Sequence, residues 1–222
     1  MATATVYCST AAANGLVVAQ GTDYPPTNQS LVAVADANSA YQGIVGQWFE
    51  SPAYYENQYF LSFDLSGYAA SPSVSAATLS LYAEYNAPYE NHTEEVYKFD
   101  WSGGGLTTAD RRTPAQLTTL YAAAAGLFAS YAWTSSTPTN AYSDFTSGSA
   151  ILTDIAASCG STLYLVVAVA DNRTGTAPGA GNGERGLWYM ASRGAGLYPR
   201  LVFTYTEAPS GFTGLTVTRP VG

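Results

Sequence analysis

The sequence predicts an all-β fold, an antiparallel jelly-roll β-sandwich with one or two short helices. Three observations predict it: apolar and polar residues alternate along much of the chain, turn residues interrupt these runs, and helical periodicity is rare. A chain of 222 residues suits a β-sandwich of one domain. We therefore expect a single domain over residues 1–206, followed by a C-terminal arm or edge strand over residues 207–222.

Strands are expected where residues of one kind recur at every second position. The clearest run is 58–65, whose apolar face carries Tyr59, Leu61, Phe63 and Leu65. Residues 161–170 are apolar on both faces, which indicates a central strand. The other expected strands cover 3–7, 11–20, 31–35, 44–49, 77–85, 96–101, 187–191 and 200–205. A total of roughly eight to ten strands is typical of a sandwich or barrel.

Two short helices are expected to cover an open end of the sandwich or the gap between its sheets. Thr113 is a capping residue, Pro114 occupies the first helical position, and Gln116 follows three residues after the cap. This pattern predicts a helix over residues 114–125. A second helix is expected over residues 149–157.

The charge distribution argues against two classes of partner. The chain has 8 Lys and Arg and 16 Asp and Glu, for a net charge of −8, and its arginines are scattered except at Arg111 and Arg112. Without a basic stripe to follow phosphates, we expect neither nucleic acid nor an anionic membrane as a partner. No apolar run approaches the ~20 residues that span a bilayer. The first residues also lack the features of a cleaved secretory signal.

Sequence motifs indicate neither a catalytic residue nor a bound cofactor. The run 181–186 matches GxGxxG, but a strand rather than a helix is expected after it, so we interpret it as a loop. His92 is the only histidine and falls in a polar segment, where we expect a solvated turn. Two long loops, 133–142 and 171–186, are rich in small and polar residues, and binding usually occurs on such loops.

Two groups of oxygen-bearing residues leave a cation site open as an alternative. Ca²⁺ takes several oxygen ligands, and each group supplies them over a short stretch of chain. The first group, either a solvated acidic turn or a Ca²⁺ site, consists of Glu90, Glu94 and Glu95. The second group, across one loop, consists of Asp171, Asn172 and Glu184.

The two cysteines allow two interpretations. Cys8 and Cys159 lie too far apart in the sequence for a CxxC motif. They are either two buried, inert thiols or one disulfide, and the disulfide requires Cα atoms within about 7 Å of each other.

Aromatic side chains provide the candidate contact residues. The chain has 18 tyrosines, more than one core accommodates, so some are expected to line a groove or an interface. Such residues either stack on sugar rings or pack against another subunit. The candidate contact residues are Tyr54, Tyr55, Tyr85, Tyr89, Trp133 and Tyr142, together with Phe212, Leu215 and Val217 in the C-terminal arm.

Several strand starts resemble those of a known family. The runs Tyr59 to Ser66, Val74 to Tyr82 and Val96 to Trp101 resemble the DNRLRE-like jelly-roll domains, which are related to carbohydrate-binding modules. The runs Ala141 to Thr146 and Tyr198 to Tyr205 follow in the expected order, so the resemblance covers residues 58–206. It implies a jelly-roll fold, and it leaves out the first fifty-odd residues and the C-terminal arm.

One segment of this resemblance also predicts a function. The segment with Phe99-Asp-Trp101, Leu106-Thr-Thr-Ala-Asp110 and the capped helix is most similar to copies in tailed-phage structural proteins. That similarity implies a head decoration protein, a fibre or a tail component. With the low charge, the many tyrosines and the start of the chain, it predicts a non-enzymatic virion structural protein, assembled in the host cytoplasm. Its partners would be other virion subunits, such as the major capsid or tail protein, and further copies of itself.

Two other classes of function are weighed against this one. The first is a carbohydrate-binding module of a secreted or surface protein, with an extracellular location and a glycan as its partner. The second is an enzyme, which no sequence motif supports. A symmetric oligomer without affinity for sugar favours the virion protein, whereas a monomer that binds glycans favours the module.

Overall fold

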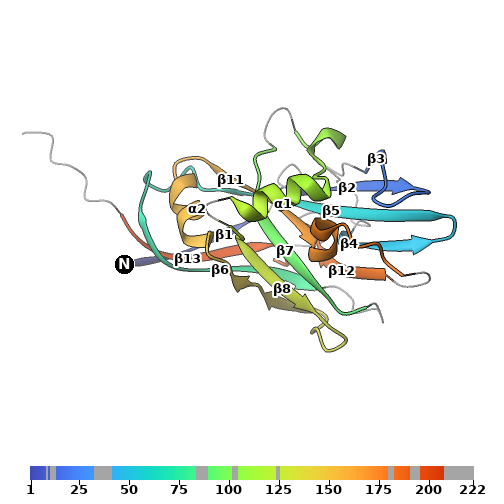
Figure 1. The fold of residues 1–222 in the computed structure, drawn as a ribbon. Helices are drawn as coiled ribbons and strands as arrows, with labels where there is room; N and C mark the ends of the chain where they lie inside the picture. Colours follow the sequence, from blue (N-terminus) through green and yellow to red (C-terminus); the bar gives the residue numbers. More distant parts are fainter. Residues whose placement is uncertain are drawn as a thin grey trace, which may run out of the picture.

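The computed structural model of the chain describes residues 1–8, 10, 14–32, 42–83, 90–101, 105–123, 126–179, 183–190 and 196–207. In these residues strands dominate, the paired strands run antiparallel, and the helices are short. The fold class predicted from the sequence, an all-β antiparallel sandwich with short helices, is therefore confirmed (Figure 1).

The strands, with three exceptions, lie where residue alternation predicted them or close by. They are β1 Ala2–Tyr7, β2 Asn14–Gly21, β3 Asn28–Val32, β4 Gln42–Glu50, β5 Ala53–Asp64, β6 Ser73–Ala83, β7 His92–Lys98, β8 Ala129–Trp133, β9 Ala141–Asp144, β10 Thr146–Ser147, β11 Thr162–Val169, β12 Gly183–Tyr189 and β13 Arg200–Thr206. The exceptions are β8, β9 and β10, three short strands that lie between the first two helices.

The strands form two connected layers. The first layer has the order β3-β2-β5-β11-β7-β8-β10, and the second has the order β1-β13-β6-β12-β4, with β9 on the other edge of β6. The layers meet at β5, whose residues 54–61 pair with β2 on one edge. On the other edge, residues 53–57 pair with β4 and residues 59–64 pair with β11. At this point β4 leaves the first layer and continues beside β12 in the second.

The inner core fills the space between the layers. Its members come from alternate positions of the long strands, as the period of two requires. They include Tyr59, Leu61 and Phe63 of β5, Leu163, Leu165 and Val167 of β11, Leu79 and Leu81 of β6, and Leu201 and Phe203 of β13. The apolar face predicted for residues 58–65 is therefore confirmed.

A second apolar cluster covers the outer face of the first layer. Phe60 of β5 and Val166 of β11 pack there with Leu117, which belongs to helix α1, Pro114–Ala122 (Figure 1). Both faces of β11 are thus buried, which explains why residues 161–170 are apolar on both sides.

Two arginines attach the segment before α1 to this outer face. Arg111 Nη2 lies 2.9 Å from Glu56 Oε2, and both side chains are almost fully buried. The next residue, Arg112, exchanges two hydrogen bonds with Gln58: its backbone N–H donates to Gln58 Oε1 at 2.8 Å, and its carbonyl accepts from Gln58 Nε2 at 2.6 Å. These contacts fix the position of the helix that closes the outer cluster.

The helices differ slightly from those expected. The capping box is present, since Thr113 Oγ1 accepts from the backbone N–H of Gln116, but α1 ends at Ala122 rather than at 125. Helix α2 spans Ile151–Ser158 instead of 149–157. The expected loop 171–186 is wrong at both ends, because α3, Ala170–Thr174, begins it and β12 includes its last residues.

The cysteines are two buried thiols, which is the first of the two interpretations of the sequence. Cys8 and Cys159 are both buried thiols that contribute to the inner core, and they form no disulfide with each other. Burial raises the pKa of Cys8 to about 12, so this thiol is not ionised at neutral pH.

The helices of the described residues are short. None of them is long and apolar enough to cross a bilayer.

Candidate functional site

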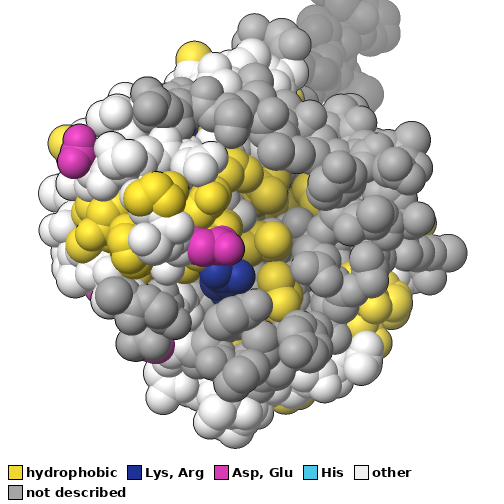
Figure 2. Space-filling model, turned by 90° about the vertical axis from the view of Figure 1, so that its right-hand side faces the viewer, with side chains coloured by type: hydrophobic (Ala, Val, Ile, Leu, Met, Phe, Trp, Pro, Cys, Tyr) yellow, Lys and Arg dark blue, Asp and Glu magenta, His cyan; other side chains and the backbone are white. Residues whose placement is uncertain are grey.

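A cluster of partly exposed aromatic side chains occupies one end of the sandwich. We call it the hairpin-end surface, and it consists of Tyr24, Trp48, Phe49, Tyr54 and Tyr55. Four of these residues flank the turn that joins β4 to β5, at the right-hand end of Figure 1. Figure 2 views the molecule from that end and shows apolar side chains gathered there. The structure thus brings together two predicted contact residues, Tyr54 and Tyr55, and adds three others.

On one side of the hairpin the aromatic rings are stacked. The rings of Trp48 and Tyr55 are nearly parallel, 5° apart, with centroids 4.9 Å from each other. Arg185 of β12 places its guanidinium carbon 4.0 Å from the centre of the Trp48 ring. Because β4 lies between β12 and β5, these two neighbours cover opposite faces of the indole. Gln20 of β2 continues the row by donating to the Tyr55 hydroxyl at 3.0 Å.

On the other side of the hairpin, the rings meet at steeper angles. Phe49 and Tyr54 are cross-strand neighbours whose ring centroids lie 4.7 Å apart. Tyr24 approaches Tyr54 edge to face, with centroids 5.6 Å apart. The Tyr24 hydroxyl donates to Gln47 Oε1 at 2.5 Å, so the aromatic surface is tied to polar groups beneath it.

Those polar groups include the second candidate cation site. Gln47 Nε2 donates to Glu184 Oε2 at 2.9 Å, and Asn172 Nδ2 donates to Gln47 Oε1 at 2.9 Å. Burial, followed by the nearby Asp171 carboxylate, raises the pKa of Glu184 to about 7. The structure therefore does bring Asp171, Asn172 and Glu184 together. Gln47 Nε2 occupies one carboxylate oxygen of Glu184, and the described residues hold no group of three or more His, Cys, Asp or Glu arranged for a metal.

The other acidic group is not a solvated turn, and that expectation is wrong. Glu90 is exposed, but Glu94 and Glu95 belong to β7 and are buried. Consecutive strand residues point to opposite faces, so Glu94 enters the inner core and Glu95 reaches the outer side. There Arg173 donates to both carboxylate oxygens of Glu95 at 2.9 Å, and the three glutamates do not converge.

His92 is also a buried residue rather than a solvated one. It begins β7, and its ring lies nearly parallel to that of Trp133, 6.1 Å away. Nδ1 lies 2.9 Å from the carbonyl oxygen of Glu90, so this nitrogen carries the hydrogen. Nε2 lies 3.5 Å from Glu94 Oε1, and the same carboxylate accepts from Trp188 Nε1 at 2.9 Å. Although burial favours the neutral ring, the Glu94 carboxylate raises the pKa of His92.

Trp133 is not a contact residue, which corrects the prediction. It is only 1% exposed and packs edge to face against Trp188 in the inner core, with ring centroids 4.9 Å apart. It ends β8, whose pairing with β7 directs the indole inward. Polar residues follow it in the sequence, and they made the segment resemble an exposed loop.

Tyr142 is partly exposed, but its contacts within the chain hold it in place. Arg200 lies 3.9 Å above the centre of its ring, and its hydroxyl is 3.0 Å from the carbonyl oxygens of Gly196 and Tyr198. It also meets Tyr82 edge to face, at 5.2 Å between centroids. It lies on β9, apart from the hairpin-end surface. The remaining predicted contacts, Tyr85, Tyr89, Phe212, Leu215 and Val217, lie outside the described residues.

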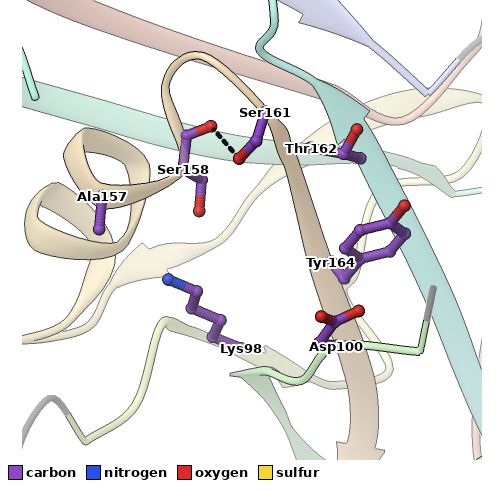
Figure 3. Close-up of a pocket in the computed structure, with 7 residues that line it drawn as sticks. All are labelled: Lys98, Asp100, Ala157, Ser158, Ser161, Thr162 and Tyr164. Atoms are coloured by element: carbon purple, nitrogen blue, oxygen red, sulfur yellow. Dashed lines mark hydrogen bonds between the residues drawn. The ribbon is translucent and has the colours of Figure 1, made fainter. Parts of the chain in front are cut away.

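A polar pocket opens between α2, β11 and the end of β7 (Figure 3). Its volume is about 500 Å³, and its lining residues are Lys98, Asp100, Ala157, Ser158, Ser161, Thr162 and Tyr164. Lys98 Nζ lies 3.5 Å from Asp154 Oδ1, and the Ser161 hydroxyl donates to the carbonyl oxygen of Ser158 at 2.9 Å. The sequence did not predict this pocket, because its walls come from three separate segments.

Comparison with protein-family models and with curated proteins finds no match for the chain. The interpretation of these sites therefore rests on their geometry and chemistry.

Proposed function

We propose that this chain is a non-enzymatic structural subunit of a virus particle, a capsid decoration or fibre/tail subunit that acts through protein–protein contacts. The observation that carries the proposal is the hairpin-end surface, where partly exposed aromatic rings meet an arginine. Tyr, Trp and Arg are the residue types enriched at the energetic centres of protein interfaces. The expected partners are other virion subunits, such as the major capsid or tail protein, and the expected location is the virion.

The rings of this surface are held in place before any partner arrives. Trp48 is fixed between Tyr55 and Arg185, and Tyr24 is fixed by its hydrogen bond to Gln47. Side chains that are already ordered lose little conformational freedom on binding, which favours affinity. A subunit of a permanent assembly benefits from such a preorganised surface.

The same arrangement favours a protein over a sugar as the partner at this end. Stacking on a sugar requires an open ring face, and both faces of Trp48 are covered by its neighbours. The ring edges remain for contact, together with the guanidinium of Arg185. Edges of aromatic rings and charged planar groups are complementary to the backbone and side chains of another protein.

Co-sedimentation tests the proposal. The chain is co-expressed with the proteins encoded beside its gene, and the lysate is separated on a density gradient. We expect the wild type to move with the assembled particles and Trp48→Ala to remain among the soluble proteins. Tyr121→Ala is the matched control, because Tyr121 is an aromatic residue, 45% exposed, on α1. A wild-type chain that never enters particles would overturn the proposal.

The polar pocket supports a second candidate function, binding of a carbohydrate. Its lining offers the ammonium group of Lys98, the carboxylate of Asp100 and several hydroxyls, with the ring of Tyr164 at one wall (Figure 3). Neighbouring sugar hydroxyls both donate and accept hydrogen bonds, so they match such a mixed lining. A volume of about 500 Å³ is in the range of small-molecule sites.

A glycan array distinguishes this second candidate from the first. If the chain is a carbohydrate-binding module, the wild type binds a set of glycans, and Asp100→Asn weakens that binding. Phe99→Leu is a control on the neighbouring residue, which does not line this pocket. Absence of binding to every glycan tested eliminates the carbohydrate interpretation and leaves the first proposal intact.

A further inference from the structure

Strand β1 lies at the edge of the second layer. Its residues pair with β13 from Ala2 opposite Tyr205 to Tyr7 opposite Arg200 (Figure 1). Within the described ranges, β13 is its only neighbour in the sheet. An edge strand presents a row of backbone N–H and C=O groups that another strand can pair with.

In the part of the chain that the structure describes, β1 has none of the usual features that prevent such pairing. Edge strands are normally blunted by charged side chains, by proline, by a bulge or by being very short. The run from Ala2 to Tyr7 contains no charged residue and no proline, and its register with β13 is regular. By contrast, β10, at the far edge of the first layer, is only two residues long.

The hydrogen-bond pattern shows which groups of β1 face outward. The N–H of Cys8 donates to the carbonyl of Pro199 at 2.9 Å, so Cys8 and every second residue before it bond towards β13. The alternate residues, Thr3, Thr5 and Tyr7, therefore direct their backbone groups to the open edge. Consistent with this, the hydroxyls of Thr3 and Thr204 are 3.3 Å apart, as expected for a closely spaced pair without backbone bonds.

We propose that two copies of this chain pair through β1, antiparallel, about a two-fold axis at Thr5. In this arrangement Thr5 lies opposite its own symmetry mate, and Thr3 lies opposite Tyr7 of the second copy. Three outward-facing residues then form three pairs of the hydrogen-bonded type, with about six new backbone bonds. The second layers of the two copies become one continuous sheet.

The lack of charged side chains on β1 allows a second copy to pair at this edge. The chain carries a net charge of −8, so two copies repel each other over most of their surfaces. β1 brings no charged side chain into the contact, and the exposed side chains at its centre are the small Thr3 and Thr5. An identical strand supplies the matching length and spacing without like charges facing each other. The inference is independent of the hairpin-end surface, which lies at the other end of the sandwich (Figure 1).

Light scattering on the purified full chain, coupled to size exclusion, tests the proposal. We expect a wild-type dimer and, for Thr5→Pro, a rise of at least about tenfold in the dissociation constant. Proline removes the outward N–H at the two-fold axis but none of the N–H groups that bond to β13. Thr5→Val is the matched control, because it retains the N–H and should leave the dimer unchanged. Circular dichroism verifies that each variant is folded.

Hydrogen exchange gives a second readout that does not depend on a variant. The amides of Thr3, Thr5 and Tyr7 should be protected at high protein concentration and should exchange faster on dilution. A wild-type monomer, or a dimer that Thr5→Pro leaves intact, overturns the proposal. Protection of these amides that is independent of concentration also overturns it, since the chain itself would then cover the edge. Trp48→Ala should remain dimeric, which separates this test from that of the proposed function.

Discussion

The amide of Gln47 donates to the carboxylate of Glu184 at 2.9 Å and so joins β4 to β12 beneath the hairpin-end surface. Gln47 also accepts from Tyr24 and from Asn172, so a single side chain connects the aromatic surface, the buried acid and α3. The cluster lies near the point where β4 leaves β5 and the layers separate. Gln47, Asn172 and Glu184 are buried, and the hydrogen bonds among them offset part of the cost of that burial.

Glu184→Gln should stabilise the protein at pH 8 and flatten its pH dependence. Burial and the Asp171 carboxylate raise the pKa of Glu184 to about 7, above its ordinary value of 4.5. The folded state therefore binds a proton more tightly than the unfolded state does. The contribution of this group to stability is complete below pH 4.5 and is lost as the pH rises towards 7.

Thermal unfolding at pH 5 and pH 8 measures this effect. A glutamine at position 184 still accepts a hydrogen bond from Gln47 and can donate one to Asp171. The Tm of the variant should therefore fall less between pH 5 and pH 8 than the Tm of the wild type. Glu50→Gln, on an exposed residue of β4, is the control and should follow the wild type. If the Tm of Glu184→Gln falls between pH 5 and pH 8 by as much as the Tm of the wild type, the pKa of Glu184 is not raised.

Removing one member of the Glu56–Arg111 pair should be more damaging than removing both. Arg111→Met leaves the Glu56 carboxylate buried and without its partner, which should cost about 3–5 kcal/mol. The double variant with Glu56→Gln should recover part of that loss, because no uncompensated charge remains. Urea unfolding measures both. A single variant as stable as the wild type would show that the pair is not buried as described.

Gly186→Ala should disrupt the inner core. A Cβ atom at this position would lie 1.7 Å from Glu94 Oε1, in a region where Glu94 also contacts His92 and Trp188. Overpacking in a core typically costs about 1–3 kcal/mol, and here a buried carboxylate must move as well. Gly67→Ala is the control, since nothing lies within 4 Å of its added Cβ. Equal stability of the two variants in urea would contradict the position of Glu94.

The thiols should react only when the protein unfolds. Cys8 is fully buried and its pKa is raised to about 12, so a thiol reagent such as DTNB should not modify it in the native protein. In denaturant without reductant, both Cys8 and Cys159 should react, because no disulfide joins them. Recovery of fewer than two thiols from the denatured chain would support the disulfide that the structure excludes.

The sequence predicted the parts of the fold in which apolar residues alternate. Leu61 and Phe63 of β5 mark a buried face by their spacing alone, and the capping box at Thr113 marks the start of a helix. Both signals are local, because strand alternation and helix capping involve residues close together in the chain. The fold class therefore followed from the sequence.

The polar interior could not be predicted in the same way. His92 and Glu94 resemble a solvated segment because their partners are distant in the sequence: Trp188 lies 94 residues after Glu94. Arg173, which neutralises Glu95, lies 78 residues away from it. Whether a charged residue is buried depends on such a partner, and one sequence does not show which residues meet. The same reason hid the burial of Trp133, which packs against Trp188 on a strand far along the chain.

Footprinting by hydroxyl radicals tests the central claim, that the hairpin-end surface is a protein contact. The oxidation of Trp48 and Tyr54 is measured by mass spectrometry in the isolated chain and in the assembled particle. We predict that both residues are oxidised in the isolated chain and protected in the particle, while Tyr121 on α1 reacts equally in the two samples. Equal oxidation of Trp48 and Tyr54 in the two samples would contradict the claim.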